Sequence, residues 1–226
     1  MSEFAGFPTK TTTFLKNLTK NNSKEWFDAH RSDYDTYWVA PAKEFVVAAG
    51  QALQKVAPVD YQPKVNGSIF RVNRDVRFSQ DKSPYKDHLD FWFWEGERKT
   101  AVSGFFLRVT ATMTGIGVGA HGFDRDRLAL YRDAVADPAT AKPLVAAVKK
   151  VEKAGYEVKG GHYKTTPRGY DVEGAMPERL IRYNALWVGE DYRHPAELRS
   201  ADMVAWAVAH WRKMAPLHRW LVGTLS

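Results

Sequence analysis

The spacing of apolar residues changes twice along this chain, and that change constrains the fold more than any other feature. Up to about residue 57, apolar and aromatic side chains such as Phe14, Leu15 and Leu18 recur at helical steps. After Pro63 the spacing becomes two, and beyond Phe123 it returns to three and four. Helices followed by strands and then by helices are typical of the α+β class.

The middle of the chain predicts a sheet. Residues 105–113 read FFLRVTATM, with apolar side chains at the odd positions, which is typical of a strand with one face on a core and one face in wetter surroundings. Similar patterns predict strands at residues 68–74, 88–95, 104–114 and 115–121. The connections between them are short, which favours antiparallel pairing over parallel strands joined by crossover helices.

The predicted architecture is therefore α+β, with a largely antiparallel sheet in the middle of the chain packed with N-terminal and C-terminal helices. We expect a single domain over residues 1–226, helical at 11–57, sheet at 66–122, and mixed but mostly helical at 123–226. A long helix is expected to begin at Pro195 and to be interrupted at Pro216, because proline lacks the amide donor of a helix interior.

Composition excludes several classes of site. The chain of 226 residues has no cysteine, so it cannot hold a disulfide framework, a thiolate zinc site, an iron–sulfur cluster or a cysteine nucleophile. Its formal net charge of +7 favours anionic partners. No apolar run has the length of about 18 residues that a membrane span needs, and the N-terminus does not read as a secretory signal, so we expect a cytoplasmic location and no membrane partner.

Charge is concentrated just before and inside the predicted sheet. Residues 64–87 carry six Arg and Lys side chains and three Asp side chains. Residues 81–84 read Asp-Lys-Ser-Pro, a turn signal, so we expect the chain to reverse there and to bring basic groups together from both sides. Such groups beside aromatic rings suit recognition of phosphate or carboxylate. The predicted ligand-binding residues are Arg71, Arg74, Arg77, Lys82, Lys86 and Arg108, and the predicted structural support is Asp75, Ser79, Asp81 and Tyr85.

An alternating pair of titratable residues opens the next predicted strand. His88 and Asp90 point to the same side of an extended chain, so the carboxylate is placed to orient the imidazole as in a general acid or base. The arginines would then stabilise negative charge that develops on a phosphoryl or acyl group. His88 and Asp90 are the predicted catalytic pair if the protein is an enzyme.

Three functional readings and one structural reading remain open. The first is a binding module that holds a phosphorylated or carboxylated small molecule, and the second is an enzyme acting through His88. The third is nucleic-acid binding, which rests on net charge and aromatic content alone. The structural alternative is a network of Arg–Asp pairs along a sheet edge, with lysines that prevent edge-to-edge pairing.

No cofactor and no metal site is predicted. Residues 117–122 match G-x-G-x-x-G but lack the βαβ context of a dinucleotide site, so these glycines are interpreted as easing a strand into a turn. The histidines are scattered, and the one combination worth checking for a metal is His88 with Asp90, joined by His121 or His30. The remaining histidines are interpreted as loop or helix-surface residues: His162, His194, His210 and His218.

Two longer motifs add a resemblance. Residues 21–27 read NNSKEWF and residues 74–88 read RDVRFSQDKSPYKDH. Together they resemble a bacterial and fungal family of conserved proteins of unknown function, marked by NN-x-x-EWF and RD-x-RFS-x-DK-x-PYK-x-H. The similarity continues through residues 104–121, 128–135 and 166–170 and so covers most of the chain. It implies one soluble cytoplasmic domain and no particular reaction. Within the first motif, Asn22 and Glu25 have the spacing of a capping box and predict a helix start.

Overall fold

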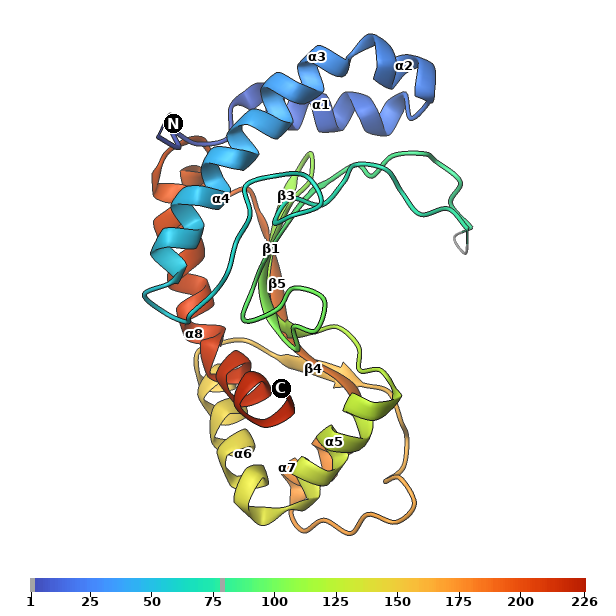
Figure 1. The fold of residues 1–226 in the computed structure, drawn as a ribbon, viewed down its shortest axis with the longest axis vertical. Helices are drawn as coiled ribbons and strands as arrows, with labels where there is room; N and C mark the ends of the chain where they lie inside the picture. Colours follow the sequence, from blue (N-terminus) through green and yellow to red (C-terminus); the bar gives the residue numbers. More distant parts are fainter. Residues whose placement is uncertain (1–2, 78–79) are drawn as a thin grey trace. The chain divides into compact units, whose positions relative to one another are not determined.

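The computed structural model describes residues 3–77 and 80–226. The chain begins with helices, continues through strands and ends mainly in helices (Figure 1). The N-terminal helices are α1 (Thr9–Lys20), α2 (Lys24–Ala29), α3 (Arg31–Tyr34), the π-helix η1 (Asp35–Val39) and α4 (Ala40–Leu53). The later helices are α5 (Arg125–Ala136), α6 (Pro138–Lys153), α7 (Ala175–Leu180), the 3-10 helix η2 (Ala196–Arg199) and α8 (Asp202–Leu225). This order confirms the predicted α+β class.

The strands form one antiparallel sheet in the order β1-β2-β3-β5-β4. They are β1 (Leu89–Trp94), β2 (Gly104–Val109), β3 (Met113–Ala120), β4 (Val158–Gly161) and β5 (Tyr183–Arg193). Most of the sheet comes from the middle of the chain, as predicted, and β4 and β5 extend it from the second half. The predicted strand at 68–74 is replaced by isolated bridges, such as that between Ile69 and Phe91.

The turn between β2 and β3 lies earlier than the sequence pattern placed it. We expected strands at 104–114 and 115–121, whereas β2 ends at Val109 and β3 begins at Met113. The Thr110 hydroxyl accepts hydrogen bonds from the Thr112 amide at 3.2 Å and the Met113 amide at 2.8 Å. Threonine supports a strand and a side-chain-stabilised turn equally well, so alternation alone did not locate the reversal.

Helix α8 continues through Pro216, so the predicted interruption is wrong. Residues on both sides of the proline are buried, including Ala215, Leu217 and Leu221. Apolar burial of this kind offsets the loss of one backbone hydrogen bond. Within the described ranges, none of the helices has both the length and the apolar content required to cross a membrane.

The chain divides into two compact units, each built from three segments. Unit 1 comprises residues 1–93, 106–116 and 191–209, and unit 2 comprises residues 94–105, 117–190 and 210–226. The single domain expected from the sequence stays a prediction.

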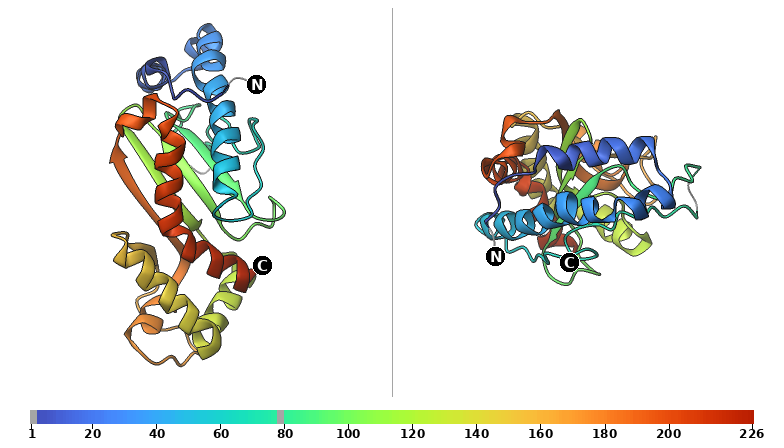
Figure 2. Two further views of the ribbon diagram at one scale, coloured as in Figure 1. Left: turned by 90° about the vertical axis from the view of Figure 1, so that its left-hand side faces the viewer. Right: turned by 90° about the horizontal axis from the view of Figure 1, so that it is seen from above.

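The core of unit 1 is aromatic. The rings of Phe45 in α4 and Phe91 in β1 lie 4.9 Å apart between centroids, and Phe7 lies 5.3 Å from Phe45. Helix α1 runs beside the rod formed by α3, η1 and α4 (Figure 2), and Phe14 packs edge-on against Trp38 at 6.0 Å. The N-terminal helices are therefore fixed by ring packing within this unit.

Unit 2 contains a buried polar cluster that the sequence did not reveal. His218 is fully buried rather than at a helix surface. One ring nitrogen lies 3.0 Å from the Ser103 hydroxyl and the other lies 3.1 Å from a Glu95 carboxylate oxygen. Burial lowers the pKa of His218, although Glu95 opposes this shift. The position of His218 in an apolar helix hid this role, because its partners come from distant residues.

Candidate functional site

The basic segment of unit 1 forms a hairpin. Asn73 and Tyr85 form an antiparallel bridge, and the Arg74 amide donates to the Pro84 carbonyl at 2.9 Å. In return, the Lys86 amide donates to the Val72 carbonyl at 2.8 Å. The predicted reversal of the chain before Tyr85 is confirmed, and it brings residues 84–86 back beside residues 72–74.

Asn22 fastens this hairpin to the N-terminal helices. Its side-chain amide nitrogen donates to the Tyr85 carbonyl at 2.9 Å, and its side-chain oxygen accepts from the Tyr85 amide at 3.0 Å. The cap of α2 is Ser23, whose hydroxyl accepts from the Trp26 amide, so the prediction of Asn22 as capping residue is wrong. The side chain of Asn22 instead satisfies the outer backbone groups of the hairpin.

A ring stack strengthens the same attachment. Phe27 in α2 and Tyr85 lie 4.2 Å apart between centroids with nearly parallel planes. Offset-stacked rings contribute beyond their buried area. Residues 22–27 and 84–86 therefore pack against each other, and these contacts join the two sequence motifs.

Asp90 is the centre of an ionic cluster on β1. Its carboxylate accepts from Arg108 Nε at 2.7 Å and from Arg108 Nη2 at 3.1 Å, and it lies 3.2 Å from His88 Nε2. His88 Nδ1 lies 2.9 Å from Asp87. Both imidazole nitrogens therefore face carboxylates.

Neighbouring groups and burial shift the pKa values of Asp90 and Lys86. Burial alone would raise the pKa of Asp90, but hydrogen bonds from His88 and Arg108 outweigh it and lower the pKa. Burial lowers the pKa of Lys86, Asp90 opposes this shift, and Arg108 adds a smaller lowering. Lys86 Nζ lies 5.3 Å from the Phe70 ring centroid. Lys86 is thus within electrostatic reach of the His88 cluster and rests on an aromatic face.

Other predicted ligand residues have separate local partners. Arg77 makes a two-pronged contact with Asp75, at 3.0 Å from Nε and 2.7 Å from Nη2, and these hydrogen bonds lower the pKa of Asp75 to about 2. Lys82 donates to the Val76 carbonyl at 2.8 Å. Both cations are exposed at the tip of the hairpin.

Arg74 occupies a third environment. Its Nη1 lies 3.1 Å from Asp81 and its Nη2 donates to the Tyr85 carbonyl at 3.4 Å. The Asp81 carboxylate also accepts hydrogen bonds from the amide and hydroxyl of Ser83. These hydrogen bonds lower the pKa of Asp81, and Arg74 adds to the shift. Ser79, predicted as structural support, lies outside the described residues.

Arg71 lines a pocket of about 540 Å³ in unit 1. The wall on one side comes from α2, α3, η1 and α4, and the other side comes from residues 64–73 and Tyr85. Buried residues such as Phe27, Tyr34 and Val72 give it an apolar lining. This volume is in the range of small-molecule sites.

The acids that line this pocket form ion pairs, whereas most of the cations that line it do not. Both lining acids have a basic neighbour on their own helical segment: Asp28 contacts Lys24 at 2.9 Å and Asp35 contacts Arg31 at 3.2 Å. Three exposed lining cations have no ion pair within 4.0 Å among the described residues. These cations are Lys43, Lys64 and Arg71. The pocket is therefore lined by both polar and apolar side chains, and its lining cations outnumber its lining acids.

The helical wall of the pocket contains an unusual turn. In η1 the Ala40 amide donates to the Asp35 carbonyl, five residues earlier. Asp35 and Val39, at the two ends of η1, both line the pocket. Single π turns within α-helices occur frequently at functional sites.

The structure thus distributes the predicted site residues over several places. His88, Asp90 and Arg108 are in direct contact, Lys86 lies within their electrostatic reach, and Arg71 lines the pocket. The predicted functional roles of these residues stay predictions. Across residues 3–77 and 80–226, no group of three or more His, Asp or Glu side chains is arranged to hold a metal ion.

Sequence reasoning missed much of the pocket. Lys64 begins the basic stretch at residues 64–87, which the sequence pattern did single out. Lys43 carried no signal, because a lysine in an amphipathic helix is most simply a solvated residue. Only the long-range attachment of the hairpin to the helices reveals that they share a pocket.

Comparison with known proteins supplies a family and no activity. A search of curated proteins and a search of solved structures each gave no match. A model of the family described as "Conserved hypothetical protein (DUF2461)" matches residues 10–220, which include both sequence motifs. The chain therefore belongs to this family of conserved hypothetical proteins.

Proposed function

We propose that the protein binds a small anionic molecule in the pocket lined by Arg71, Lys43 and Lys64. The observation that carries this proposal is the charge imbalance of the pocket. Its acids are already paired, whereas three of its lining cations have no ion-pair partner among the described residues. Phosphate or carboxylate would supply the missing negative charge.

The lining indicates what else the ligand contains. Phe27, Tyr34 and Tyr85 place aromatic surface inside the pocket, and Val72 adds aliphatic surface. An anionic head group alone would leave this surface in water. We therefore expect a molecule with an apolar or ring-bearing part that packs on these side chains.

Replacement of Arg71 tests this function. Arg71→Gln removes one cation and should weaken binding of an aromatic phosphate or carboxylate by about tenfold, because a charge-assisted hydrogen bond is worth roughly 1.5 kcal/mol or more. Isothermal titration with phenyl phosphate and benzoate measures the change. Arg212→Gln, at an exposed position of α8, is the matched control. Equal affinity of Arg71→Gln and wild-type protein would contradict the proposal.

A second candidate function uses His88 as an acid or base on a phosphoryl or acyl group. The observation that favours it is an imidazole oriented by Asp90 and flanked by Arg108. Proton transfer would require Asp87, whose side chain is 45% exposed, to release His88 Nδ1. A His88→Gln protein that keeps any phosphatase or esterase activity found in the wild type would exclude this candidate.

A further inference from the structure

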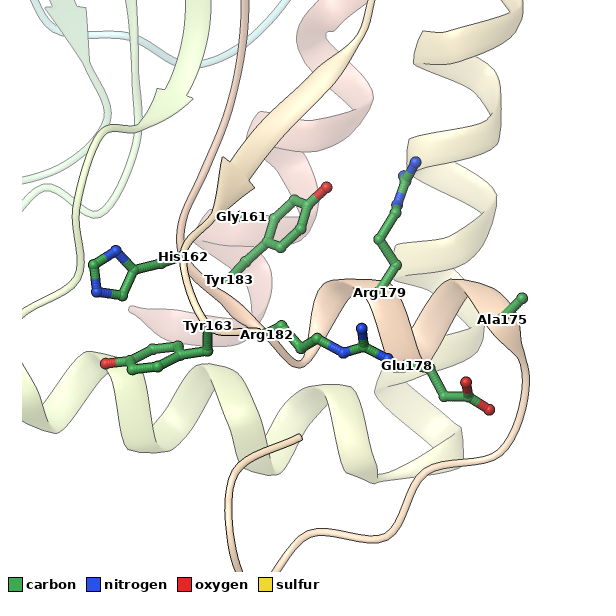
Figure 3. Close-up of a pocket in the computed structure, with 8 residues that line it drawn as sticks. All are labelled: Gly161, His162, Tyr163, Ala175, Glu178, Arg179, Arg182 and Tyr183. Atoms are coloured by element: carbon green, nitrogen blue, oxygen red, sulfur yellow. The ribbon is translucent and has the colours of Figure 1, made fainter. Parts of the chain in front are cut away.

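Unit 2 has a pocket of its own, with a volume of about 410 Å³. It lies where β4 ends, beside α7 and the start of β5 (Figure 3). Its polar lining comes from His162, Tyr163, Arg179, Arg182 and Glu178. None of these residues belongs to the site proposed above, so this pocket is an independent feature.

A bulge in the sheet shapes this pocket. The register between β4 and β5 shifts between Lys159 and Gly161, and Gly160 has a φ of +137°. A Cβ at Gly160 would come 2.0 Å from the Ala185 carbonyl oxygen, so only glycine fits. Bulges commonly redirect the side chains that follow them.

The chain after the bulge is held against the start of β5. The amides of His162 and Tyr163 both donate to the Arg182 carbonyl, at 3.2 Å and 2.9 Å. In Figure 3, His162 and Tyr163 project from this strand end, and Arg182 extends from the opposite segment. The rings of His162 and Tyr163 point to one side of the strand end, and the Arg182 guanidinium extends to the other side.

Three guanidinium groups in this region have an unused donor. The Nε atoms of Arg132, Arg179 and Arg182 are buried and donate to no acceptor among the described residues. Arg179 still pairs with Glu152 through Nη2 at 2.7 Å. Arg132 lies over the ring of Tyr163, with its guanidinium carbon 4.9 Å from the ring centroid. A buried donor without an acceptor is costly, and an oxyanion offers several acceptors at once.

Arg182 is the strongest candidate to hold such an anion. It lines the pocket and makes no ion pair within 4.0 Å in the described part of the chain. Its planar fork suits a phosphate or carboxylate better than a single ammonium would. Glu178 adds one carboxylate to the lining, which repels an anion and partly offsets the attraction of Arg182.

We propose that this pocket is a second ligand site, which binds the phosphate or carboxylate head group of a small molecule through Arg182. Tyr163 and Tyr183 supply ring surface for the part of the ligand next to the head group. The ligand is small because the pocket holds about 410 Å³. The site is independent of the pocket of unit 1.

The test is a titration of the full chain with inorganic phosphate, phenyl phosphate and benzoate, followed by amide NMR shifts. We expect saturable shifts at Gly161, His162 and Tyr163, separate from any shifts around Arg71. Comparing the affinities for phosphate and benzoate identifies the preferred head group. Comparing the affinities for phenyl phosphate and phosphate measures the contribution of the tyrosine rings.

Two variants make the assignment specific. Arg182→Gln should weaken binding in unit 2 by about tenfold, whereas Arg125→Gln, at an exposed position of α5 in the same unit, should not change it. Arg71→Gln should leave the shifts at residues 161–163 intact, so the two pockets can fail separately. If Arg182→Gln does not fold, Arg182→Lys keeps the charge and should still weaken binding, because an ammonium lacks the planar fork of a guanidinium.

Two results would overturn the proposal. One is an absence of saturable shifts at residues 161–163 with all three probes. The other is an unchanged affinity at those residues in a folded Arg182→Gln protein.

Discussion

At the scale of single residues, Asp90 joins the ionic cluster on β1. Its carboxylate, 16% exposed, contacts both the Arg108 guanidinium and the His88 ring. Replacing it leaves two donors facing an amide that accepts less well and carries no charge. We expect Asp90→Asn to lower the free energy of unfolding by about 2 kcal/mol.

The contribution of Asp90 should also make the stability of the protein depend on pH. The folded pKa of Asp90 lies below the ordinary value of 3.8. Its stabilising contribution is therefore complete above that value and is lost as the pH falls through the folded pKa. Urea unfolding of the wild type between pH 6 and pH 3 should show this loss, and Asp90→Asn should show less of it.

The exposed Asp126 provides the control for this experiment. Asp126→Asn in the first turn of α5 should change stability by only a few tenths of a kcal/mol. If Asp90→Asn and Asp126→Asn unfold at the same urea concentration, the cluster around Asp90 does not stabilise the protein.

At the scale of elements, two adjacent asparagines differ sharply in role. The Asn22 side chain bonds the amide and the carbonyl of Tyr85, whereas the Asn21 side chain donates to the Asn17 carbonyl of its own helix. Asn22→Ala should therefore cost about 1–2 kcal/mol and loosen the hairpin, and Asn21→Ala should cost much less.

Hydrogen exchange measures this difference directly. The Tyr85 amide loses its acceptor in Asn22→Ala and should exchange faster, while in Asn21→Ala it should exchange at the wild-type rate. Equal protection of Tyr85 in both variants would show that the Phe27 stack alone holds the hairpin.

Prediction from sequence succeeded where local pattern determines structure. The change in apolar spacing predicted the helices and the antiparallel strands, and the Asp81–Pro84 turn signal predicted the hairpin. It failed where the outcome depends on residues far apart in the chain. The hydrogen bond between Asn22 and Tyr85 and the burial of His218 cannot be predicted from local spacing, because each depends on a partner far away in the chain.

The same distinction applies to the candidate site, of which one part was predictable from the sequence and another was not. The contact between His88 and Asp90 followed from strand alternation, since side chains two positions apart share a face. The pocket did not follow, because Tyr34, Lys43 and Arg71 come from a helical rod and a separate irregular segment. Counting basic residues located the charge without showing which cations are already neutralised by their neighbours.

At the scale of the whole molecule, the expected single domain has a thermodynamic test. The boundaries of the two compact units fall inside β1, β2, β3, β5 and α8. Residues within one continuous strand rarely unfold separately, so we expect one cooperative transition. Calorimetry should give equal calorimetric and van't Hoff enthalpies, and two resolved transitions would establish two domains instead.

The π turn at Asp35–Val39 also has a consequence for how this protein tolerates change. Each residue of an α-helix advances the side chains by about 100° around the axis, so one inserted residue resets the phase of everything beyond it. Tyr34 before the turn can therefore face the pocket while Phe45 after it faces β1. Deleting a single residue here would restore a regular helix and rotate one of these two surfaces away from its target.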